Sequence, residues 1–251
     1  MPTLNGSRET SGGSAASWRR CWCCWVAALP RSRTETRQSR RRTPSHRKRP
    51  PNLPVSPDDS RVLFLGDSLT DGTATTDKTT LGFAPRLAAL EGWNDYRVDG
   101  VALFGFLSPG ISEEAHRNFR DWLQQMYFTM SYAPNAIIFQ AGANDKPYPP
   151  EALQAIVIET VKVAHKYFPD AGLILLGPIT SSPDLTAVND TYARSAYEAD
   201  IPYVDAKGKP ITASSERARL ISADGWHPND EGHQVIAETR VAWIAEFEKR
   251  Q

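Results

Sequence analysis

Cysteine is missing from most of this 251-residue chain, since Cys21, Cys23 and Cys24 all lie near the N-terminus. Residues 55–251 therefore hold no disulfide and no thiol nucleophile, and any covalent catalysis there must use another group. Long apolar runs are lacking as well. The apolar stretch at 21–29 is far shorter than the roughly 20 residues that span a bilayer. The sequence thus predicts no transmembrane segment.

Charge is divided unequally along the chain, although the formal net charge is zero. Residues 1–54 hold twelve Lys and Arg against two Asp and Glu, whereas residues 55–251 hold seventeen against twenty-seven. The first segment is rich in Arg, Ser, Thr and Pro and too poor in apolar residues to form a core, so we expect a disordered basic tail. Clustered arginines attract phosphates, but a solvated tail is the simpler interpretation, and no nucleic acid is expected to bind the folded domain.

The tail has two further interpretations. Arg19 and Arg20 precede the apolar stretch, as in a secretion signal, but the stretch is short and no small-residue cleavage site follows it. Alternatively, translation starts naturally at Val55, where the compact sequence begins, because valine codons serve as bacterial starts. The sequence leaves the localisation open between cytoplasm and secretion.

From Val55 onward, short apolar runs alternate with longer amphipathic ones. The short runs predict strands at 62–65, 96–98, 136–140, 173–176 and 203–204. The amphipathic runs predict helices at 82–92, 112–128, 150–168, 185–199 and 229–249. This alternation predicts one α/β domain, residues 55–251, with a parallel sheet and helices on both faces. Such sheets bind ligands at the carboxyl ends of their strands.

Polar residues follow three of the predicted strands at this edge. Ser68 comes after the first strand, Asn144 after the third, and Asp224 and His227 beyond the fifth. A serine hydroxyl needs a base to become a nucleophile, and His227 is the candidate. Asp224 is close enough in sequence to orient the imidazole, while the Asn144 amide and the Ser68 backbone N–H can stabilise an oxyanion. The set is complete for acyl transfer.

Three sequence blocks resemble those of the SGNH hydrolases, also called the GDSL esterase and lipase family. They are Gly-Asp-Ser-Leu at 66–69, Gly-Ala-Asn-Asp at 142–145 and Asp-Gly-Trp-His-Pro at 224–228. The resemblance implies a flavodoxin-like three-layer sandwich around a parallel sheet of about five strands. It also implies ester hydrolysis without metal or cofactor, with Ser68 as nucleophile, His227 as base, Asp224 as its partner and Asn144 as an oxyanion donor.

The block that should supply another oxyanion amide departs from the family pattern. In similar enzymes a second glycine lies three residues after the first, but here Gly100 is followed at that spacing by Leu103, and Gly105 comes two residues later. A backbone N–H does not require glycine, so either residue can be the donor. We expect Gly105, because its freedom in φ eases the turn.

Several of these residues also have structural explanations. Taken alone, Ser68 fits a helix capping box with Asp71. Asp67 and Asp145 are expected to accept backbone amides at turns. The other histidines are expected to be structural, with a solvated or capping role for the last of them: His46, His116, His165 and His233.

Alternative functions and the substrate remain open. An α/β-hydrolase is disfavoured because residue 70 is Thr where its nucleophile elbow needs Gly. A metal-dependent phosphoesterase, using Asp67, Asp71, Asn144, Asp224 and His227, and a non-catalytic binding module are the remaining alternatives. Hydroxyls of the loop 70–80 and the rings of Phe104, Phe106, Tyr148 and Trp226 are expected in the cleft. They suit small or carbohydrate-linked esters, such as acetyl esters. The oligomeric state is not predicted.

Overall fold

The computed structural model describes residues 57–111, 118–129, 131–179, 185–205 and 216–249. The expected tail at 1–54 lies outside these residues, as does the first part of the helix predicted at 112–128. The described residues all belong to one unit, residues 47–251. The site predicted from the sequence lies within them.

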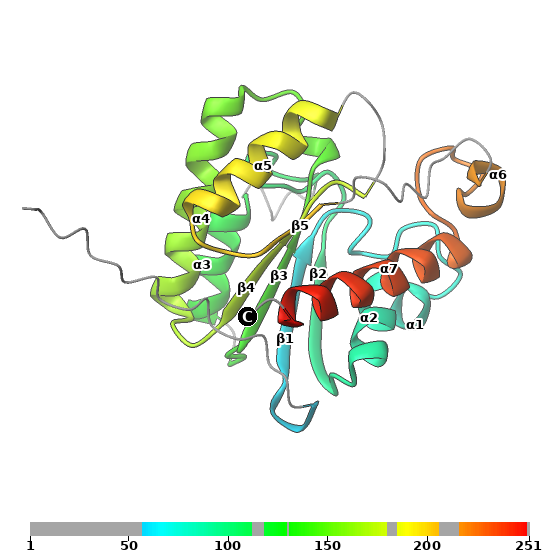
Figure 1. Ribbon diagram of the computed structural model, residues 1–251, viewed down its shortest axis with the longest axis horizontal. Helices are drawn as coiled ribbons and strands as arrows, with labels where there is room; N and C mark the ends of the chain where they lie inside the picture. Colours follow the sequence, from blue (N-terminus) through cyan, green and yellow to red (C-terminus); the bar gives the residue numbers. More distant parts are fainter. Residues whose placement is uncertain (1–56, 112–117, 130, 180–184, 206–215, 250–251) are drawn as a thin grey trace, which may run out of the picture. The chain divides into compact units, whose positions relative to one another are not determined.

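Five parallel strands form one sheet in the order β2-β1-β3-β4-β5 (Figure 1). They are β1 (Arg61–Gly66), β2 (Asp95–Gly100), β3 (Ala136–Gln140), β4 (Gly172–Leu176) and β5 (Tyr203–Val204). The three central strands are buried almost throughout, because their near-continuous apolar runs face helices on both sides. The order is that of flavodoxin-like sheets, in which β1 and β3 lead to the ligand site.

Seven α-helices are present in the described residues. They are α1 (Lys78–Leu81), α2 (Phe83–Glu91), α3 (Phe119–Thr129), α4 (Pro150–Tyr167), α5 (Thr186–Glu198), α6 (Arg217–Leu220) and α7 (Asp230–Lys249). The predictions for α2, α4, α5 and α7 agree with the structure to within one residue at each end. The sequence did not predict α1 and α6, because a single helical turn has no periodicity to detect.

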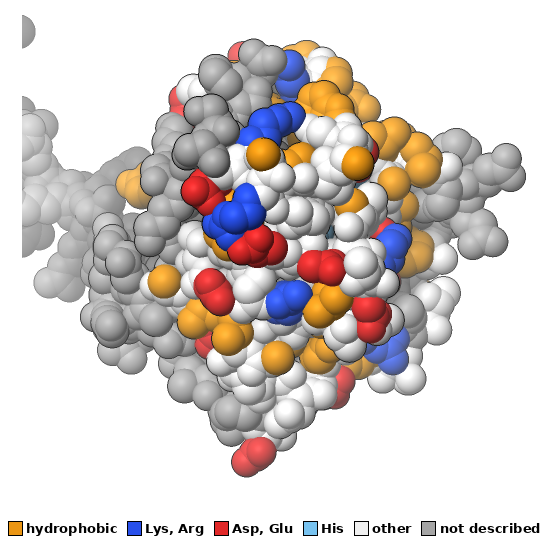
Figure 2. Space-filling model, turned by 90° about the vertical axis from the view of Figure 1, so that its right-hand side faces the viewer, with side chains coloured by type: hydrophobic (Ala, Val, Ile, Leu, Met, Phe, Trp, Pro, Cys, Tyr) orange, Lys and Arg blue, Asp and Glu red, His pale blue; other side chains and the backbone are white. Residues whose placement is uncertain are grey.

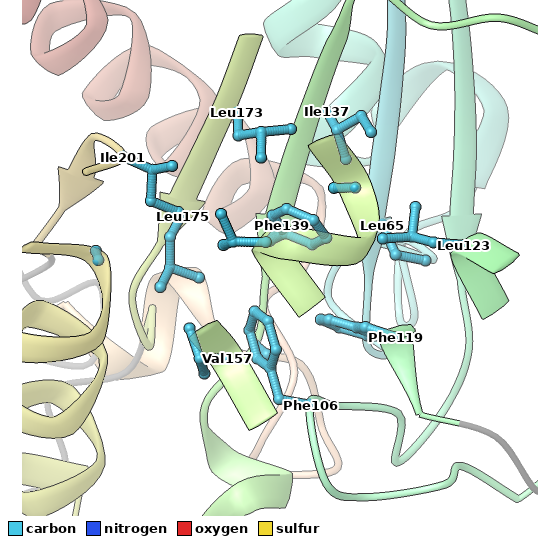
Figure 3. Close-up of a cluster of buried hydrophobic side chains, with 14 of the residues drawn as sticks. Leu65, Phe106, Phe119, Leu123, Ile137, Phe139, Val157, Leu173, Leu175 and Ile201 are labelled. Atoms are coloured by element: carbon cyan, nitrogen blue, oxygen red, sulfur yellow. The ribbon is translucent and has the colours of Figure 1, made fainter. Parts of the chain in front are cut away.

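Helices cover both faces of the sheet, and each face has its own core (Figure 1). On the face covered by α3, α4 and α5, the ring of Phe119 lies 4.9 Å from that of Phe106 and 6.1 Å from that of Phe139, measured between centroids (Figure 3). On the other face, Phe83 of α2 and Ile236 of α7 pack against the sheet. The two cores fix the helices, and with them the loops that meet at the carboxyl edge.

Charged side chains of both signs lie side by side on the face that carries α6 in Figure 1 (Figure 2). Arg219 of α6 pairs with Glu216 and with Glu231 of α7. These groups are about half exposed, so each pair adds little to stability. Their effect is to hold α6 beside the start of α7, on either side of the loop that carries Asp224 and His227.

Candidate active site

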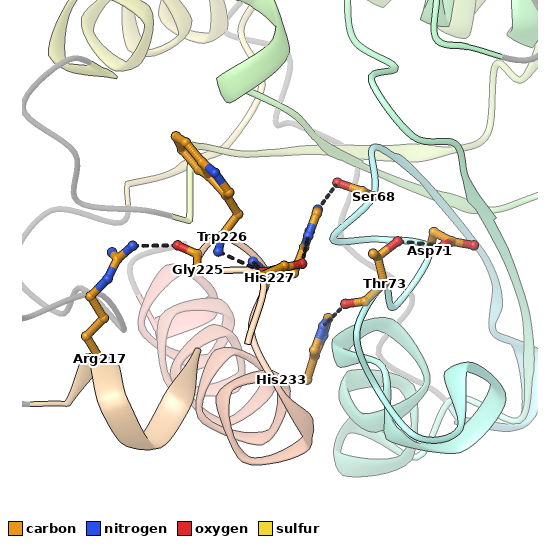
Figure 4. A network of polar contacts seen from close by, with 9 residues as sticks. Ser68, Asp71, Thr73, Arg217, Gly225, Trp226, His227 and His233 are labelled. Atoms are coloured by element: carbon orange, nitrogen blue, oxygen red, sulfur yellow. Dashed lines mark hydrogen bonds and ion pairs between the residues drawn. The ribbon is translucent and has the colours of Figure 1, made fainter. Parts of the chain in front are cut away.

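Ser68 lies in the tight turn that follows β1. The backbone N–H groups of Asp71 and Thr73 close this turn by donating to the carbonyl groups of Asp67 (3.0 Å) and Ser68 (2.9 Å). The capping-box interpretation is wrong, because the Asp71 N–H that it assigns to the serine hydroxyl is bonded elsewhere. The Ser68 Oγ atom lies instead 2.9 Å from Nε2 of His227 (Figure 4).

His227 lies between Ser68 and Asp224. Its Nδ1 atom is 2.7 Å from Oδ2 of Asp224, while Oδ1 of the same carboxylate accepts the backbone N–H groups of Trp226 (2.8 Å) and His227 (2.9 Å). These bonds, that from the Trp226 amide above all, hold the pKa of Asp224 well below its usual range. An ionised carboxylate at Nδ1 favours the imidazole tautomer with its proton there, which leaves the Nε2 lone pair facing Ser68.

The loop that carries Asp224 and His227 is itself tied down. The Ser222 N–H donates to the His227 carbonyl at 2.8 Å. The Arg217 guanidinium, from α6, donates to the Gly225 carbonyl at 2.5 Å (Figure 4). The imidazole is therefore held at its position by the loop backbone as well as by the carboxylate.

Asn144 follows β3 in a short 3-10 turn, Ala143–Asp145. The residue before this turn, Gly142, can only be glycine, because a β-carbon there would lie 2.5 Å from Cγ of Pro178. The Asn144 Nδ2 atom donates to the Phe104 carbonyl at 3.1 Å. A carboxamide has two N–H groups, and the second has no acceptor among the described residues. Asn144 lines the cleft and can offer this N–H to a ligand.

Gly105 does not offer its amide to the cleft. Its N–H donates to the Ser108 carbonyl at 3.0 Å, and a β-carbon would lie 2.7 Å from the carboxylate oxygens of Asp145. Close packing therefore explains this glycine, and the structure does not support it as an oxyanion donor. Leu103 lines the cleft instead, with φ at +60°, and its N–H has no acceptor among the described residues. A leucine thus holds a left-handed conformation in the wall of the cleft.

Two buried carboxyl groups beside the site accept backbone amides, as the sequence predicts. The carboxylate of Asp145 accepts the N–H groups of residues 106–108 at 2.9–3.0 Å and the Tyr192 hydroxyl at 2.5 Å. Asp67 accepts the Leu69 N–H at 2.9 Å, and burial raises the pKa of Asp67 to about 7. Through its bonds to residues 106–108, Asp145 fixes the loop whose Phe104 carbonyl accepts the Asn144 amide.

Two residues of α7 support the loop that follows Ser68; the sequence predicted a solvated or capping role for His233 and no role for Asp230. Asp230 accepts the backbone N–H (2.8 Å) and the hydroxyl (2.6 Å) of Thr76. His233 is fully buried; its Nδ1 accepts the Phe83 N–H at 3.0 Å and its Nε2 faces the Thr73 carbonyl at 3.4 Å (Figure 4). His233 therefore caps α2 from a different helix, and it is not solvated. An isolated histidine in a helix gives no sequence signal for such a contact.

A cleft of about 360 Å³ opens beside Ser68 and His227. Its walls include the apolar side chains of Leu69, Leu103 and Leu185, together with Trp226, which is 73% exposed. The site thus combines a polar centre with apolar walls.

Other side chains expected in the cleft lie elsewhere. Phe104 and Phe106 are fully buried in the core, and Tyr148 is not among the residues that line the cleft. The threonine hydroxyls of the loop 70–80 bond within the protein; that of Thr70, for example, donates to Gln140 at 2.8 Å. The sequence showed that these residues were near the site but could not show which way they face.

The fold and this site define a class of protein, the carboxylic ester hydrolases built on a flavodoxin-like α/β sandwich. The chain belongs to the GDSL-like lipase/acylhydrolase family, whose model matches residues 64–235. A GDSL lipase of Mycobacterium tuberculosis is 27% identical over 187 residues, which cover 70% of this chain and 78% of that protein.

Solved esterase structures share the fold at low sequence identity. A psychrotrophic esterase from Pseudoalteromonas sp. has 15% identity and a TM-score of 0.56, over 76% of this chain and all of the other. A carbohydrate esterase family 2 enzyme from Myceliophthora fergusii has 18% identity and a TM-score of 0.57, over 78% and 68% of the two chains. In the part of the chain that the structure describes, no helix is long and apolar enough to cross a membrane.

Proposed function

We propose that this chain is a serine esterase that hydrolyses small or carbohydrate-linked esters, such as acetyl esters, through an acyl-serine intermediate on Ser68. The proposal rests on one observation. An unbroken line of contacts runs from Ser68 Oγ to His227 Nε2 (2.9 Å) and from His227 Nδ1 to Asp224 Oδ2 (2.7 Å). No metal or cofactor is needed for this chemistry.

In the first half-reaction, Ser68 Oγ attacks the ester carbonyl carbon while His227 Nε2 takes the hydroxyl proton. Asp224 stabilises the imidazolium through Nδ1. The carbonyl oxygen gains negative charge and accepts hydrogen bonds from the free N–H of Asn144 and the backbone N–H groups of Ser68 and Leu103. The imidazolium then protonates the alcohol oxygen, the ester C–O bond breaks and the acyl group stays on Ser68.

In the second half-reaction, water takes the place of the alcohol. His227 removes a proton from the water as its oxygen attacks the acyl carbon, and the same donors stabilise the second oxyanion. The bond to Ser68 Oγ breaks, the imidazolium returns its proton to that oxygen, and the carboxylic acid leaves. The enzyme returns to its starting protonation state.

The preference for small or sugar-linked esters is supported by the cleft. Its volume of about 360 Å³ is small, and the exposed ring of Trp226 lies beside the base, where an alcohol group must leave. Sugar rings pack well on exposed aromatic faces. One solved structure with this fold is a two-domain esterase active on acetylated mannans, with 17% identity and a TM-score of 0.59.

The test uses p-nitrophenyl esters from acetyl to palmitoyl, beside acetylated xylan and chitin fragments. Short esters are expected to turn over fastest, and Ser68→Ala is expected to lower kcat by at least about a thousandfold. Ser131→Ala is the matched control, because Ser131 is exposed, follows α3 and is not among the residues that line the cleft. Turnover by Ser68→Ala near the wild-type rate would contradict the mechanism.

The two alternatives make different predictions. A metal-dependent phosphoesterase would lose activity on chelation and tolerate Ser68→Ala. Among the described residues, no group of three His, Cys, Asp or Glu side chains is placed to bind a metal ion. A binding module would leave Ser68 unlabelled by a fluorophosphonate probe. The proposal expects activity in the presence of chelator and labelling of Ser68.

A further inference from the structure

Leu103 combines two features that are unfavourable in themselves. Its φ of +60° lies in the left-handed region, where the β-carbon of a leucine crowds the following carbonyl. Its side chain is apolar, yet the residue is 52% exposed in the wall of the cleft. A glycine at this position would avoid both costs. Disfavoured conformations that the surroundings hold in place are concentrated at functional sites, so the leucine side chain calls for an explanation.

The surroundings of Leu103 hold its conformation firmly. Its carbonyl accepts the Ser108 hydroxyl at 2.5 Å, and the next residue, Phe104, is fully buried and donates its N–H to the Val101 carbonyl at 3.1 Å. The Asn144 side chain donates to the Phe104 carbonyl at 3.1 Å. The loop therefore cannot rotate to withdraw the leucine side chain without breaking these contacts.

The chemistry of the proposed reaction assigns two sides to the cleft. His227 must protonate the departing alcohol, so the alcohol group lies on the side of His227 and its neighbour Trp226. The acyl group is the remaining substituent of the carbonyl carbon and points away from the base. In the proposed mechanism the Leu103 N–H donates to the carbonyl oxygen, and the β-carbon is only two bonds from that nitrogen. The leucine side chain therefore lies within reach of the acyl group.

We propose that the Leu103 side chain is the wall that limits the length of the acyl group and gives the site its preference for short acyl chains. This specificity role rests on the proposed esterase function. It is separate from the donor role of the Leu103 backbone, because every residue other than proline supplies the N–H. Removing the side chain keeps the donor and opens the acyl side of the cleft.

The test measures kcat/KM for p-nitrophenyl acetate, butyrate, hexanoate and octanoate with the wild type, Leu103→Ala and Leu103→Gly. Both variants are expected to raise the octanoate-to-acetate ratio by roughly tenfold or more, the size of effect that a few methylene groups produce in an apolar pocket. Trp226→Ala is the matched control, since Trp226 lines the same cleft on the alcohol side. The Trp226→Ala variant is expected to change the rates for a series of acetyl esters that differ in their alcohol group. Its octanoate-to-acetate ratio is expected to stay within about twofold of the wild-type ratio.

Two outcomes overturn the inference and are distinguishable. In the first, the octanoate-to-acetate ratio stays constant or falls in both variants while turnover still depends on Ser68. That result contradicts the acyl-length role of Leu103 but not the proposed esterase function. Absence of any Ser68-dependent ester hydrolysis in the wild type contradicts the proposed function itself. Leu103→Gly removes the left-handed strain, so its melting temperature is expected to equal or exceed that of the wild type. This variant keeps the test available if Leu103→Ala folds poorly.

Discussion

At the scale of single residues, Asp67 links the turn that carries Ser68 to the stability of the protein. Asp67 is 2% exposed, and burial raises the pKa of its carboxyl group from 3.8 to about 7. Between these two pH values the folded protein keeps a proton that the unfolded chain has released. The contribution of Asp67 to stability is therefore greatest in acid, falls as the pH rises from about 4 to about 7, and is constant above that range. The full change is on the order of 4 kcal/mol.

Asp67→Asn is expected to remove this slope. The asparagine Oδ1 can still accept the Leu69 N–H, while loss of the Gln140 contact lowers stability equally at every pH. Urea unfolding at pH 4 to 8 should give a difference in unfolding free energy, wild type minus variant, that falls with rising pH. The depressed pKa of His233 produces a slope of the opposite sign, but it is common to both proteins and cancels. A difference that does not change with pH would show that Asp67 is ionised at low pH in the folded protein.

Single residues also show where sequence-based prediction of the site succeeds and fails. Ser68, Asn144, Asp224 and His227 were predicted to lie together because each follows a strand, and strand ends of a parallel sheet share one edge. The freedom of glycine in φ favours Gly105 as the donor, but the backbone φ is set by the bonds of the whole loop, which place Leu103 in the left-handed region. Local residue preference cannot show such a constraint.

At the scale of secondary-structure elements, a contact between helices supports the loop that follows Ser68. His233 of α7 accepts the N–H of Phe83, the first residue of α2, and its ring stacks on that of Phe83 with centroids 6.4 Å apart. The cap of α2 at Gly82 provides no side-chain acceptor. Without His233 this buried N–H would have no partner, which costs about 1–3 kcal/mol.

His233→Ala is therefore expected to lower the unfolding free energy by about 2 kcal/mol or more, since a cavity adds to the lost hydrogen bond. His233→Asn should recover part of the loss, because its side-chain oxygen can accept the same N–H. Denaturant unfolding at pH 7 measures both effects. Equal stability of the alanine variant and the wild type would show that the cap contributes nothing.

The elements themselves were largely predictable from hydrophobic periodicity. Residues 150–167 show it over several turns, and the structure places α4 there. In contrast, α1 depends on a cap, with the Asp77 carboxylate accepting the Thr79 N–H at 2.9 Å, and a cap alone is a weak signal. The contacts between elements, such as that of His233 with α2, depend on the packing of distant segments and have no local signature.

At the scale of the whole molecule, the charge is divided between two segments of opposite sign. Residues 55–251 carry a net charge of −10 and residues 1–54 a net charge of +10. We propose that the hydrolase domain lies in residues 55–251, because the candidate site lies within them. At neutral pH the full chain has no net charge to oppose association, whereas the domain alone repels its copies.

Deleting residues 1–54 is therefore expected to raise solubility at pH 7 and low salt, with kcat/KM for p-nitrophenyl acetate within about twofold of the full chain. Added salt should reduce the difference in solubility, because screening weakens both the repulsion between domains and their attraction to the basic tail. Precipitation at pH 7, measured over a range of ionic strength for both chains, checks the charge argument. The activity of the shortened chain checks the domain boundary independently. A shortened chain that is soluble but inactive would mean that residues 1–54 contribute to the site. A change in net charge alone cannot remove the contacts between Ser68, His227 and Asp224.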